Sequence, residues 1–121
     1  MKILFFALAL LSSLAFGIPE DSFERDFDSR VLTNFQAMKH GEFTNAQGLR
    51  IRYHVDLKQQ ATKTLVVLPG RTEAAQKYAE LIYDLRSPEL NIFIMDHQGQ
   101  GESERPLRFT DKGHVRRSRD Y

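Results

Sequence analysis

Two short apolar runs with a helical pattern between them constrain the fold of this chain more than any other feature. The runs are Thr64–Leu68 (TLVVL) and Asn91–Met95 (NIFIM), and neither alternates polar with apolar residues. Runs of this kind are typical of strands that are covered on both faces of a parallel sheet. Adjacent parallel strands need a crossover connection, so we expect a right-handed βαβ unit from about residue 64 to residue 95.

The segment between the two runs predicts the crossover helix. Its apolar residues recur at i, i+3, i+4 and i+7 and form one stripe: Tyr78, Leu81, Ile82 and Leu85. Thr72 is expected to cap the start of this helix, and Ser87-Pro88 to end it. Glu73 and Lys77 lie four residues apart and are expected to form an ordinary helix-surface pair.

A β-hairpin is predicted upstream of the βαβ unit. Residues 42–44 and 49–55 flank the turn-forming segment Asn45–Gly48. The second strand alternates, which places Leu49, Ile51, Tyr53 and Val55 on one half-buried face. Before the hairpin, an N-terminal extension at residues 18–38 is expected to be helical, because four apolar residues recur at helical spacing: Phe23, Phe27, Val31 and Phe35.

Residues 1–17 have the layout of a secretory signal peptide. Lys2 is followed by an apolar run from Ile3 to Leu11, and small residues lie at Ala15 and Gly17. We expect cleavage after Gly17 and export to the periplasm or the medium. A membrane anchor is the alternative, but a span needs about 20 apolar residues and this run has nine.

Composition excludes several functional classes. With no cysteine, the chain has no disulfide framework, no thiolate metal site and no cysteine nucleophile. With 17 Lys+Arg against 16 Asp+Glu, it lacks the surplus of positive charge that a dedicated nucleic-acid binder needs. We expect no nucleic-acid partner, no metal and no cofactor.

A polar loop, Asp96–Pro106, follows the second apolar run, at the strand end where open α/β sheets place their ligands. Gly101-Glu102-Ser103-Glu104-Arg105 begins like a nucleophile elbow, but Arg105 stands where the second glycine is required. Asp96, Gly99, Gly101 and Ser103 are therefore expected to fold a compact structural loop, with positive φ at the glycines.

Other polar residues admit functional and structural interpretations. His97 and His114 could be a base or metal ligands, but no complete set of partners can be assembled, which favours loop histidines. The arginine-rich end, residues 105–119, could attract phosphate or anionic headgroups, although a solvated face is the usual meaning of such a cluster.

Three segments together resemble the N-terminal portion of the bacterial lysophospholipase and monoacylglycerol lipase-like α/β hydrolases, which are grouped with the serine aminopeptidase-type hydrolases. They are LPGRTEAAQKYAEL (68–81), MDHQGQGESER (95–105) and GHVRRSRDY (113–121). The chain departs from the family pattern at two positions. Gln98 replaces the usual arginine in the D-H-R-G-x-G-x-S loop, and Ser118 replaces an aromatic or apolar residue.

The resemblance implies an α/β fold in which a hairpin and a βαβ unit form the N-terminal half of an α/β-hydrolase domain, here residues 39–121. It implies that the catalytic serine, acid and histidine lie beyond Tyr121, that the backbone N–H of Arg71 is an oxyanion-hole donor, and that Gly70 and the Asp96–Ser103 loop lie near the active site. The substrate implied for the intact enzyme is a lipid ester, and peripheral membrane contact is left open.

On this interpretation the chain is a fragment of a serine ester hydrolase and is expected to be inactive alone. The alternative is a non-catalytic exported binding protein or a degenerate gene product. The family's strand order also pairs the strand at residues 64–68 with the strand that carries the nucleophile. Because the sequence lacks that strand, we expect an unpaired apolar edge, loss of cover over Val66, Val67, Ile92 and Ile94, and self-association.

Overall fold

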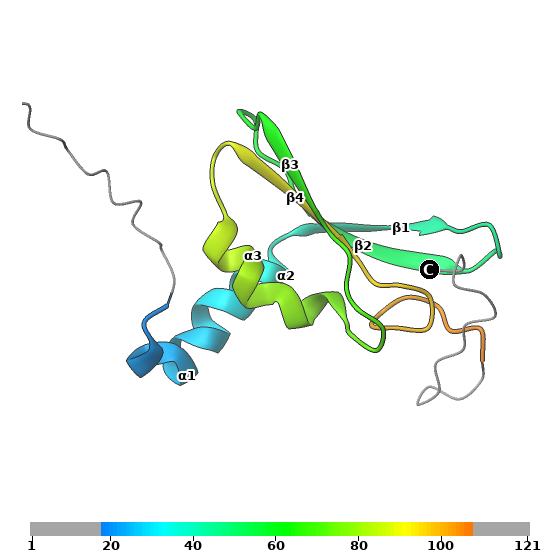
Figure 1. Cartoon of the computed structure of the whole chain (residues 1–121), viewed down its shortest axis with the longest axis horizontal. Coiled ribbons are helices and arrows are strands. Elements are labelled where there is room, and N and C mark those ends of the chain that lie inside the picture. Colours follow the sequence, from blue (N-terminus) through cyan, green and yellow to red (C-terminus); the bar gives the residue numbers. More distant parts are fainter. Residues whose placement is uncertain (1–17, 108–121) are drawn as a thin grey trace, which may run out of the picture.

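A computed structural model describes residues 18–107 of the chain, and these residues form one mixed sheet with helices against one of its faces (Figure 1). The strand order is β1-β2-β4-β3. The bounds are Lys39–Thr44 for β1, Arg50–Asp56 for β2, Lys63–Val67 for β3 and Leu90–Met95 for β4. β1 with β2 and β2 with β4 pair antiparallel, whereas β3 and β4 pair parallel. The predicted hairpin and βαβ unit are confirmed.

The hairpin turn is fixed by one asparagine side chain. Asn45 Oδ1 accepts hydrogen bonds from the backbone N–H of Gln47 at 3.0 Å and of Leu49 at 2.9 Å. Gly48 has φ +79°, a conformation that residues with a Cβ rarely adopt. These bonds set the register in which Phe43 faces Ile51.

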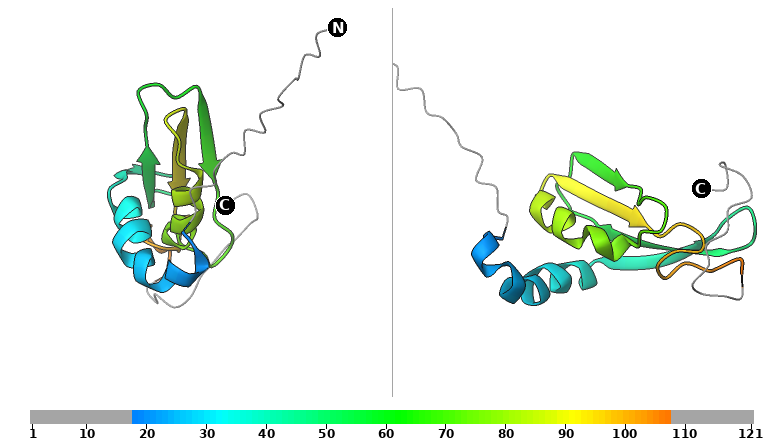
Figure 2. Two further views of the ribbon diagram at one scale, coloured as in Figure 1. Left: turned by 90° about the vertical axis from the view of Figure 1, so that its left-hand side faces the viewer. Right: turned by 60° about the horizontal axis from the view of Figure 1, so that its bottom comes forward.

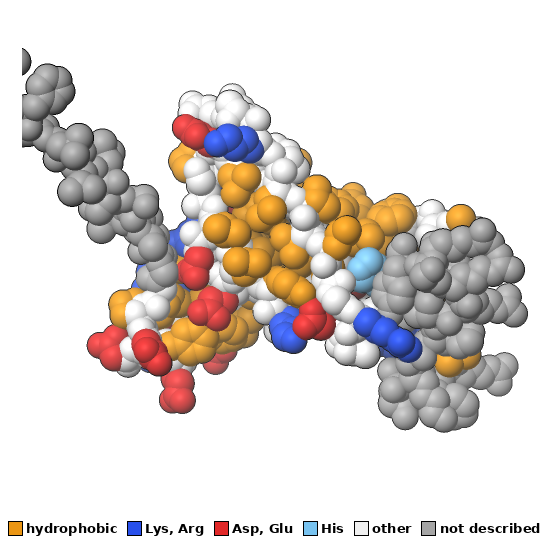
Figure 3. Space-filling view, in the orientation of Figure 1, with side chains coloured by type: hydrophobic (Ala, Val, Ile, Leu, Met, Phe, Trp, Pro, Cys, Tyr) orange, Lys and Arg blue, Asp and Glu red, His pale blue; other side chains and the backbone are white. Residues whose placement is uncertain are grey.

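The N-terminal extension is a run of helical turns of changing pitch. A 3₁₀ turn (Glu20–Ser22) precedes α1 (Phe23–Asp26), a π-helical segment (Phe27–Leu32) and α2 (Thr33–Gln36). Thr33 Oγ1 donates to the carbonyl of Asp28, five residues earlier, which suits the wider π-helical turn. Val31 and Phe35 are buried against the sheet and α3, and the exposed side is acidic (Figure 3).

The crossover helix begins later than predicted. It consists of a 3₁₀ turn (Ala75–Tyr78) followed by α3 (Ala79–Leu85). The prediction that Thr72 caps it is wrong, because Thr72 lies before the helix with φ +71° and the helix has no side-chain cap from its own N-cap residue. The predicted stripe is also partly wrong, since Leu81 and Leu85 are 45% and 42% exposed. The 3₁₀ turn rotates the buried side to Ala75, Ala79, Ile82 and Tyr83.

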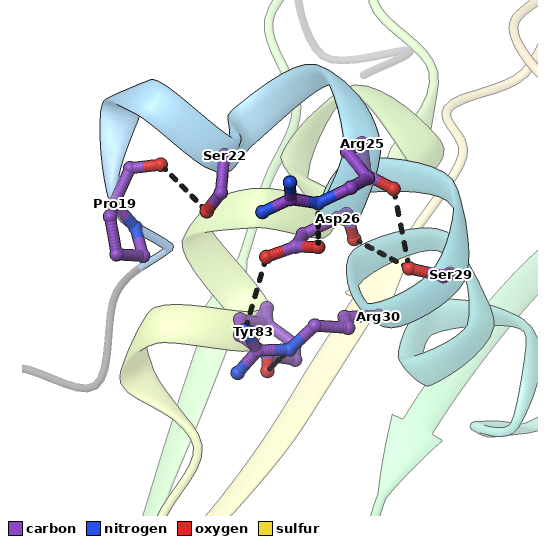
Figure 4. A network of polar contacts seen from close by, with 7 residues as sticks. All are labelled: Pro19, Ser22, Arg25, Asp26, Ser29, Arg30 and Tyr83. Atoms are coloured by element: carbon purple, nitrogen blue, oxygen red, sulfur yellow. Dashed lines mark hydrogen bonds and ion pairs between the residues drawn. The ribbon is translucent and has the colours of Figure 1, made fainter.

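Tyr83 ties α3 to the N-terminal helices (Figure 4). Arg30 Nε donates to the Tyr83 hydroxyl at 3.1 Å, and the guanidinium of Arg30 lies 5.7 Å from the ring centroid. Arg86 stacks on the same ring. Asp26 pairs with Arg30 at 3.5 Å. The two helical segments therefore form one layer, which lies on a single side of the sheet (Figure 2).

The sheet is covered by helices on that face alone within residues 18–107. Val67, Ile92 and Ile94 point into the helix-side core and are 9%, 0% and 0% exposed, whereas Val66 on the opposite face is 54% exposed. The prediction that the strand at residues 64–68 is covered on both faces is therefore wrong. Loss of cover is seen at Val66 but not at the other three side chains, because the N-terminal helices add to the cover that α3 gives.

The alternation predicted for β2 is present, but its apolar face is the one away from the helices. Tyr53 stacks on Phe93 there, with ring centroids 5.6 Å apart. The helix side carries His54 instead, which is 8% exposed and lies 4.8 Å from the ring of Phe35. Alternation alone could not decide which of the two faces the helices would cover.

The signal peptide, His114, Ser118 and most of the arginine-rich end lie outside the described residues. The boundaries at residues 17 and 38 and the export of the chain stay predictions. From Ile18 to Leu107, no helix is long and apolar enough to cross a membrane.

Candidate active-site turn

The turn after β3, residues 69–73, holds the most strained backbone conformation of the described chain. Thr72 has φ +71° and is the one non-glycine residue with positive φ among residues 18–107. This region is unfavourable for a β-branched side chain, and such outliers persist where surrounding contacts enforce them, often at functional sites. The turn lies at the carboxyl end of a parallel strand, where α/β sheets bind ligands.

The loop after β4 anchors both ends of this turn. His97 Nε2 lies 3.0 Å from the carbonyl oxygen of Pro69, and the histidine is 8% exposed. At the other end, the backbone N–H of Glu73 donates to Gln100 Oε1 at 3.0 Å and to the carbonyl of Gly70 at 3.2 Å. The pairing of β3 with β4 brings the two segments together, because parallel strands end at the same edge of a sheet.

Asp96 joins the loop to the start of the crossover helix. Its side chain is almost fully buried, and its Oδ1 accepts from the backbone N–H of Ala75 at 2.6 Å while Oδ2 accepts from that of Glu102 at 3.0 Å. Asp96 therefore accepts the hydrogen bond of the first helical N–H, which is the capping role that the sequence predicted for Thr72. A carboxylate at a helix N-terminus is also favoured by the helix dipole.

Ser103 is bound into the same loop. It is 3% exposed, its hydroxyl donates to the carbonyl of Asp96 at 2.7 Å, and its Oγ accepts from the backbone N–H of Arg52 at 2.8 Å. Gly99 and Gly101 have φ +78° and +48°, and a Cβ at Gly101 would lie 2.2 Å from the Asp96 carboxyl carbon. This geometry gives Ser103 a structural position and leaves its hydroxyl engaged with backbone groups.

The Glu73 carboxylate connects the start of the turn to the crossover helix. Its Oε2 accepts from the backbone N–H of Gly70 at 3.0 Å and from the Tyr78 hydroxyl at 2.5 Å, and its Oε1 accepts from Lys77 Nζ at 2.5 Å. Hydrogen bonds from Lys77 and Tyr78, followed by the bond from Gly70, lower the pKa of Glu73 to about 2. The predicted Glu73–Lys77 pair is thus confirmed, but Glu73 lies before the helix, so the pair connects the turn to the helix instead of lying on a helix surface.

Two backbone donors of the turn remain available. Within the described part of the chain, the N–H groups of Arg71 and Thr72 carry no hydrogen bond, and both residues are exposed. Adjacent free N–H groups at a strand-to-helix turn form a place where negative charge is stabilised. The arrangement can therefore receive an anionic oxygen.

An open cavity of about 250 Å³ lies on the helix side of this loop. Its lining residues come from the N-terminal helices, β2 and the two loops: Phe35, His54, Ala74, Gln76, Asp96, Gly101 and Glu102. Burial lowers the pKa of His54 and outweighs the nearby charges of Asp96 and Glu102, which raise it. Residues 18–107 contain no group of three or more His, Cys, Asp and Glu side chains placed to hold a metal ion.

Sequence analysis predicted which segments lie together, but it did not identify several of the residues that hold them. Gln98, the departure from the family pattern, accepts at 2.9 Å from Asn45 Nδ2 in the hairpin turn. Gln100 and Tyr78 were not identified as site residues. A loop glutamine carries no periodic signal. Tyr78 lies five residues after Glu73, in the first turn of the crossover helix, and only this spacing could have indicated that its hydroxyl reaches the Glu73 carboxylate.

The comparisons with known proteins agree with this geometry. The model of the family described as "Serine aminopeptidase, S33" matches residues 59–121, just over half of the chain. The chain therefore belongs to this hydrolase family, and its fold is the N-terminal portion of an α/β hydrolase. A crystal structure of a probable hydrolytic enzyme from Pseudomonas aeruginosa PAO1 superposes with a TM-score of 0.51 at 19% identity, over 60% of this chain and 25% of that one.

Two curated relatives have a higher sequence identity to this chain. Lysophospholipase L2 of Escherichia coli K12 is 40% identical over 96 residues, which are 78% of this chain and 28% of the relative. A probable lysophospholipase L2 of Haemophilus influenzae is 32% identical over 73 residues, 60% of this chain and 23% of the relative. The chain thus spans about a quarter of the length of these relatives.

Proposed function

We propose that this chain provides the oxyanion-binding portion of a serine ester hydrolase that acts on lysophospholipids. The observation that carries the proposal is the strained turn at residues 70–73, in which the backbone N–H groups of the exposed residues Arg71 and Thr72 have no partner in residues 18–107. The relatives named lysophospholipase L2 support the substrate class. Monoacylglycerols offer the same acyl ester without the phosphate and are the second substrate to test.

The chemistry needs these donors at one moment of the reaction. When a serine oxygen attacks the acyl carbonyl, the carbonyl π electrons move onto its oxygen, and an oxyanion forms. The Arg71 N–H would donate to that oxyanion, and removal of one such donor costs about 3 kcal/mol of transition-state stabilisation. Collapse of the intermediate expels the alcohol, and water then releases the fatty acid.

The chain alone is proposed to have no turnover. Its sequence contains no Gly-x-Ser-x-Gly motif, and the Ser103 hydroxyl is held between Asp96 and Arg52. We expect that a fluorophosphonate probe does not label the purified chain. Labelling at Ser103 would contradict this part of the proposal.

A chimera tests the positive part. The 96 matched residues of Escherichia coli lysophospholipase L2 are exchanged for those of this chain, and fatty-acid release from lysophosphatidylcholine and monoacylglycerol is measured. We expect hydrolysis, and about a 100-fold fall in kcat for Gly70→Val, because one donor is displaced. A Cβ at Gly70 would lie 2.8 Å from Glu73 Oε2. Thr44→Val on β1 is the control.

Two results would count against the proposal. A folded chimera that hydrolyses neither ester would favour the alternative of a non-catalytic binding protein. Loss of folded protein equal to loss of activity in the Gly70→Val chimera would make the turn structural only.

A further inference from the structure

We propose that Glu73 is a positioning residue whose carboxylate holds the Gly70–Glu73 turn in the conformation that presents the Arg71 and Thr72 amides outward. The inference rests on the proposed function, since the presented amides matter to catalysis only if they receive an oxyanion. It assigns a role to a side chain that sequence analysis explained as half of an ordinary helix-surface pair.

The Glu73 carboxylate lies over the start of the turn. Glu73 Oε2 accepts from the Gly70 N–H, which begins the turn, and from the Tyr78 hydroxyl on the first turn of the helix. Its oxygen would be 2.8 Å from a Cβ at position 70, so the side chain folds directly over Gly70. One side chain thereby links the turn to the helix that follows it.

Thr72 holds a strained backbone conformation within the turn. A threonine at φ +71° does not adopt this conformation by local preference, and surrounding bonds must enforce it. Gln100 fixes the Glu73 amide and His97 approaches the Pro69 carbonyl, but both lie at the ends of the turn. The Glu73 carboxylate accepts from the amide of Gly70, the residue directly before Arg71, at 3.0 Å. The Tyr78 hydroxyl accepts from the same amide at a longer 3.4 Å and itself donates to the Glu73 carboxylate.

The negative charge of Glu73 is compensated by its hydrogen-bond donors. A carboxylate close to an oxyanion site would repel the developing negative charge if it were unpaired. Glu73 instead accepts bonds from Lys77, Tyr78 and Gly70, and Lys77 brings a compensating positive charge at 2.5 Å. The same three donors keep the pKa of Glu73 at about 2, so the brace persists at every pH at which a serine hydrolase operates.

A purely superficial ion pair is the competing explanation. Exposed pairs of this kind contribute little to stability, and the Lys77 side chain is 66% exposed. The two explanations differ in what they expect of Thr72. If Glu73 enforces the strained turn, its removal lets Thr72 relax, and a glycine at position 72 makes the brace unnecessary.

The experiment is a double-mutant cycle by NMR on the full 121-residue chain. Glu73→Ala is made alone and with Thr72→Gly. We expect the Thr72 Cα and Cβ shifts of the single variant to leave the left-handed range, and exchange of the Gly70 amide to quicken at least tenfold. In the Thr72→Gly background, Glu73→Ala should shift the Arg71 amide resonance several-fold less than it does in the background with Thr72. In Glu73→Gln, which keeps an acceptor oxygen, the Thr72 shifts and the Gly70 exchange rate should lie between those of the wild type and those of Glu73→Ala.

Glu80→Ala is the matched control, because this glutamate is exposed on α3 and its side chain has no hydrogen bond within residues 18–107. It should leave the Thr72 shifts and the Gly70 exchange unchanged. The inference is overturned if Glu73→Ala behaves as this control does, or if its effect is equal in both backgrounds at position 72.

A titration with sodium butylphosphonate, a tetrahedral anion, separates this inference from the proposed function. Shifts of the Arg71 and Thr72 amides in the wild-type chain that are lost in Glu73→Ala support both. If the turn depends on Glu73 but the phosphonate shifts neither amide, the oxyanion assignment fails while the positioning role stands. If the phosphonate shifts both amides equally in the two proteins, the positioning role fails alone.

Discussion

Replacing Asp96 by asparagine should destabilise the chain far more than its small change in shape suggests. The two carboxylate oxygens have separate partners, the N–H groups of Ala75 at 2.6 Å and of Glu102 at 3.0 Å. An asparagine offers one acceptor oxygen, so its NH₂ group must face one of these backbone donors. Asp96→Asn therefore breaks one bond and leaves either the buried Ala75 N–H or the partly buried Glu102 N–H without its acceptor.

The size of the effect follows from these two losses. A hydrogen bond to a charged group contributes about 1.5 to 3 kcal/mol, and an unsatisfied buried donor costs about 1 to 3 kcal/mol. The free energy of unfolding should fall by about 3 to 5 kcal/mol. With a urea m-value of about 1.5 kcal/mol per molar, the midpoint should move down by about 2 to 3 M.

Urea unfolding followed by far-UV circular dichroism measures this shift. Asp84→Asn is the control, since Asp84 is exposed on α3 and its replacement should change the unfolding free energy by less than about 0.5 kcal/mol. A midpoint for Asp96→Asn equal to that of the control would refute the reasoning. It would mean that the bonds to Ala75 and Glu102 do not hold the helix start in solution.

Two further predictions concern pH and association. Burial lowers the pKa of His54 below its usual 6.5, so the unfolded chain takes up the proton more readily. The free energy of unfolding should therefore decline as pH falls from about 7 through the folded pKa. His54→Gln should flatten this decline, measured as urea midpoints against pH, whereas the exposed His40→Gln should not. Parallel curves for His54→Gln and the wild type would contradict this prediction. The chain should also self-associate through the β3 edge, which has no strand beyond it within residues 18–107. In light scattering after size exclusion, Val66→Lys should restore a monomer and Leu81→Lys on the helix side should not; a monomeric wild type would contradict this.

Much of the fold was predictable because its signals are local. Alternation in residues 49–55, the turn at Asn45–Gly48 and the two apolar runs each specify one element without reference to the others. The family resemblance then supplied their order. What the apolar runs could not specify is which face is covered, because Val66 and Val67 are equally apolar in sequence but differ from 54% to 9% in exposure.

The start of the crossover helix was not predictable by the same means. Thr72 has a good capping side chain, and local preference alone would place the helix there. The backbone at Thr72 is instead in the left-handed region, and the helix takes its cap from Asp96, twenty-one residues later. A cap that comes from another segment leaves no pattern in the sequence near the helix.

The wrongly predicted helix start and the candidate site have the same physical origin. Because β3 and β4 are parallel neighbours, their carboxyl ends lie together, and the loop after β4 provides the hydrogen bonds that the turn after β3 lacks. Asp96 serves the helix start and Gln100 the Glu73 amide. These bonds from another segment act together with the Glu73 carboxylate on the turn that holds Thr72 at positive φ. Part of what supports the turn is therefore distant from it in sequence, and substitutions in the Asp96–Ser103 loop should disturb the turn before they disturb the sheet.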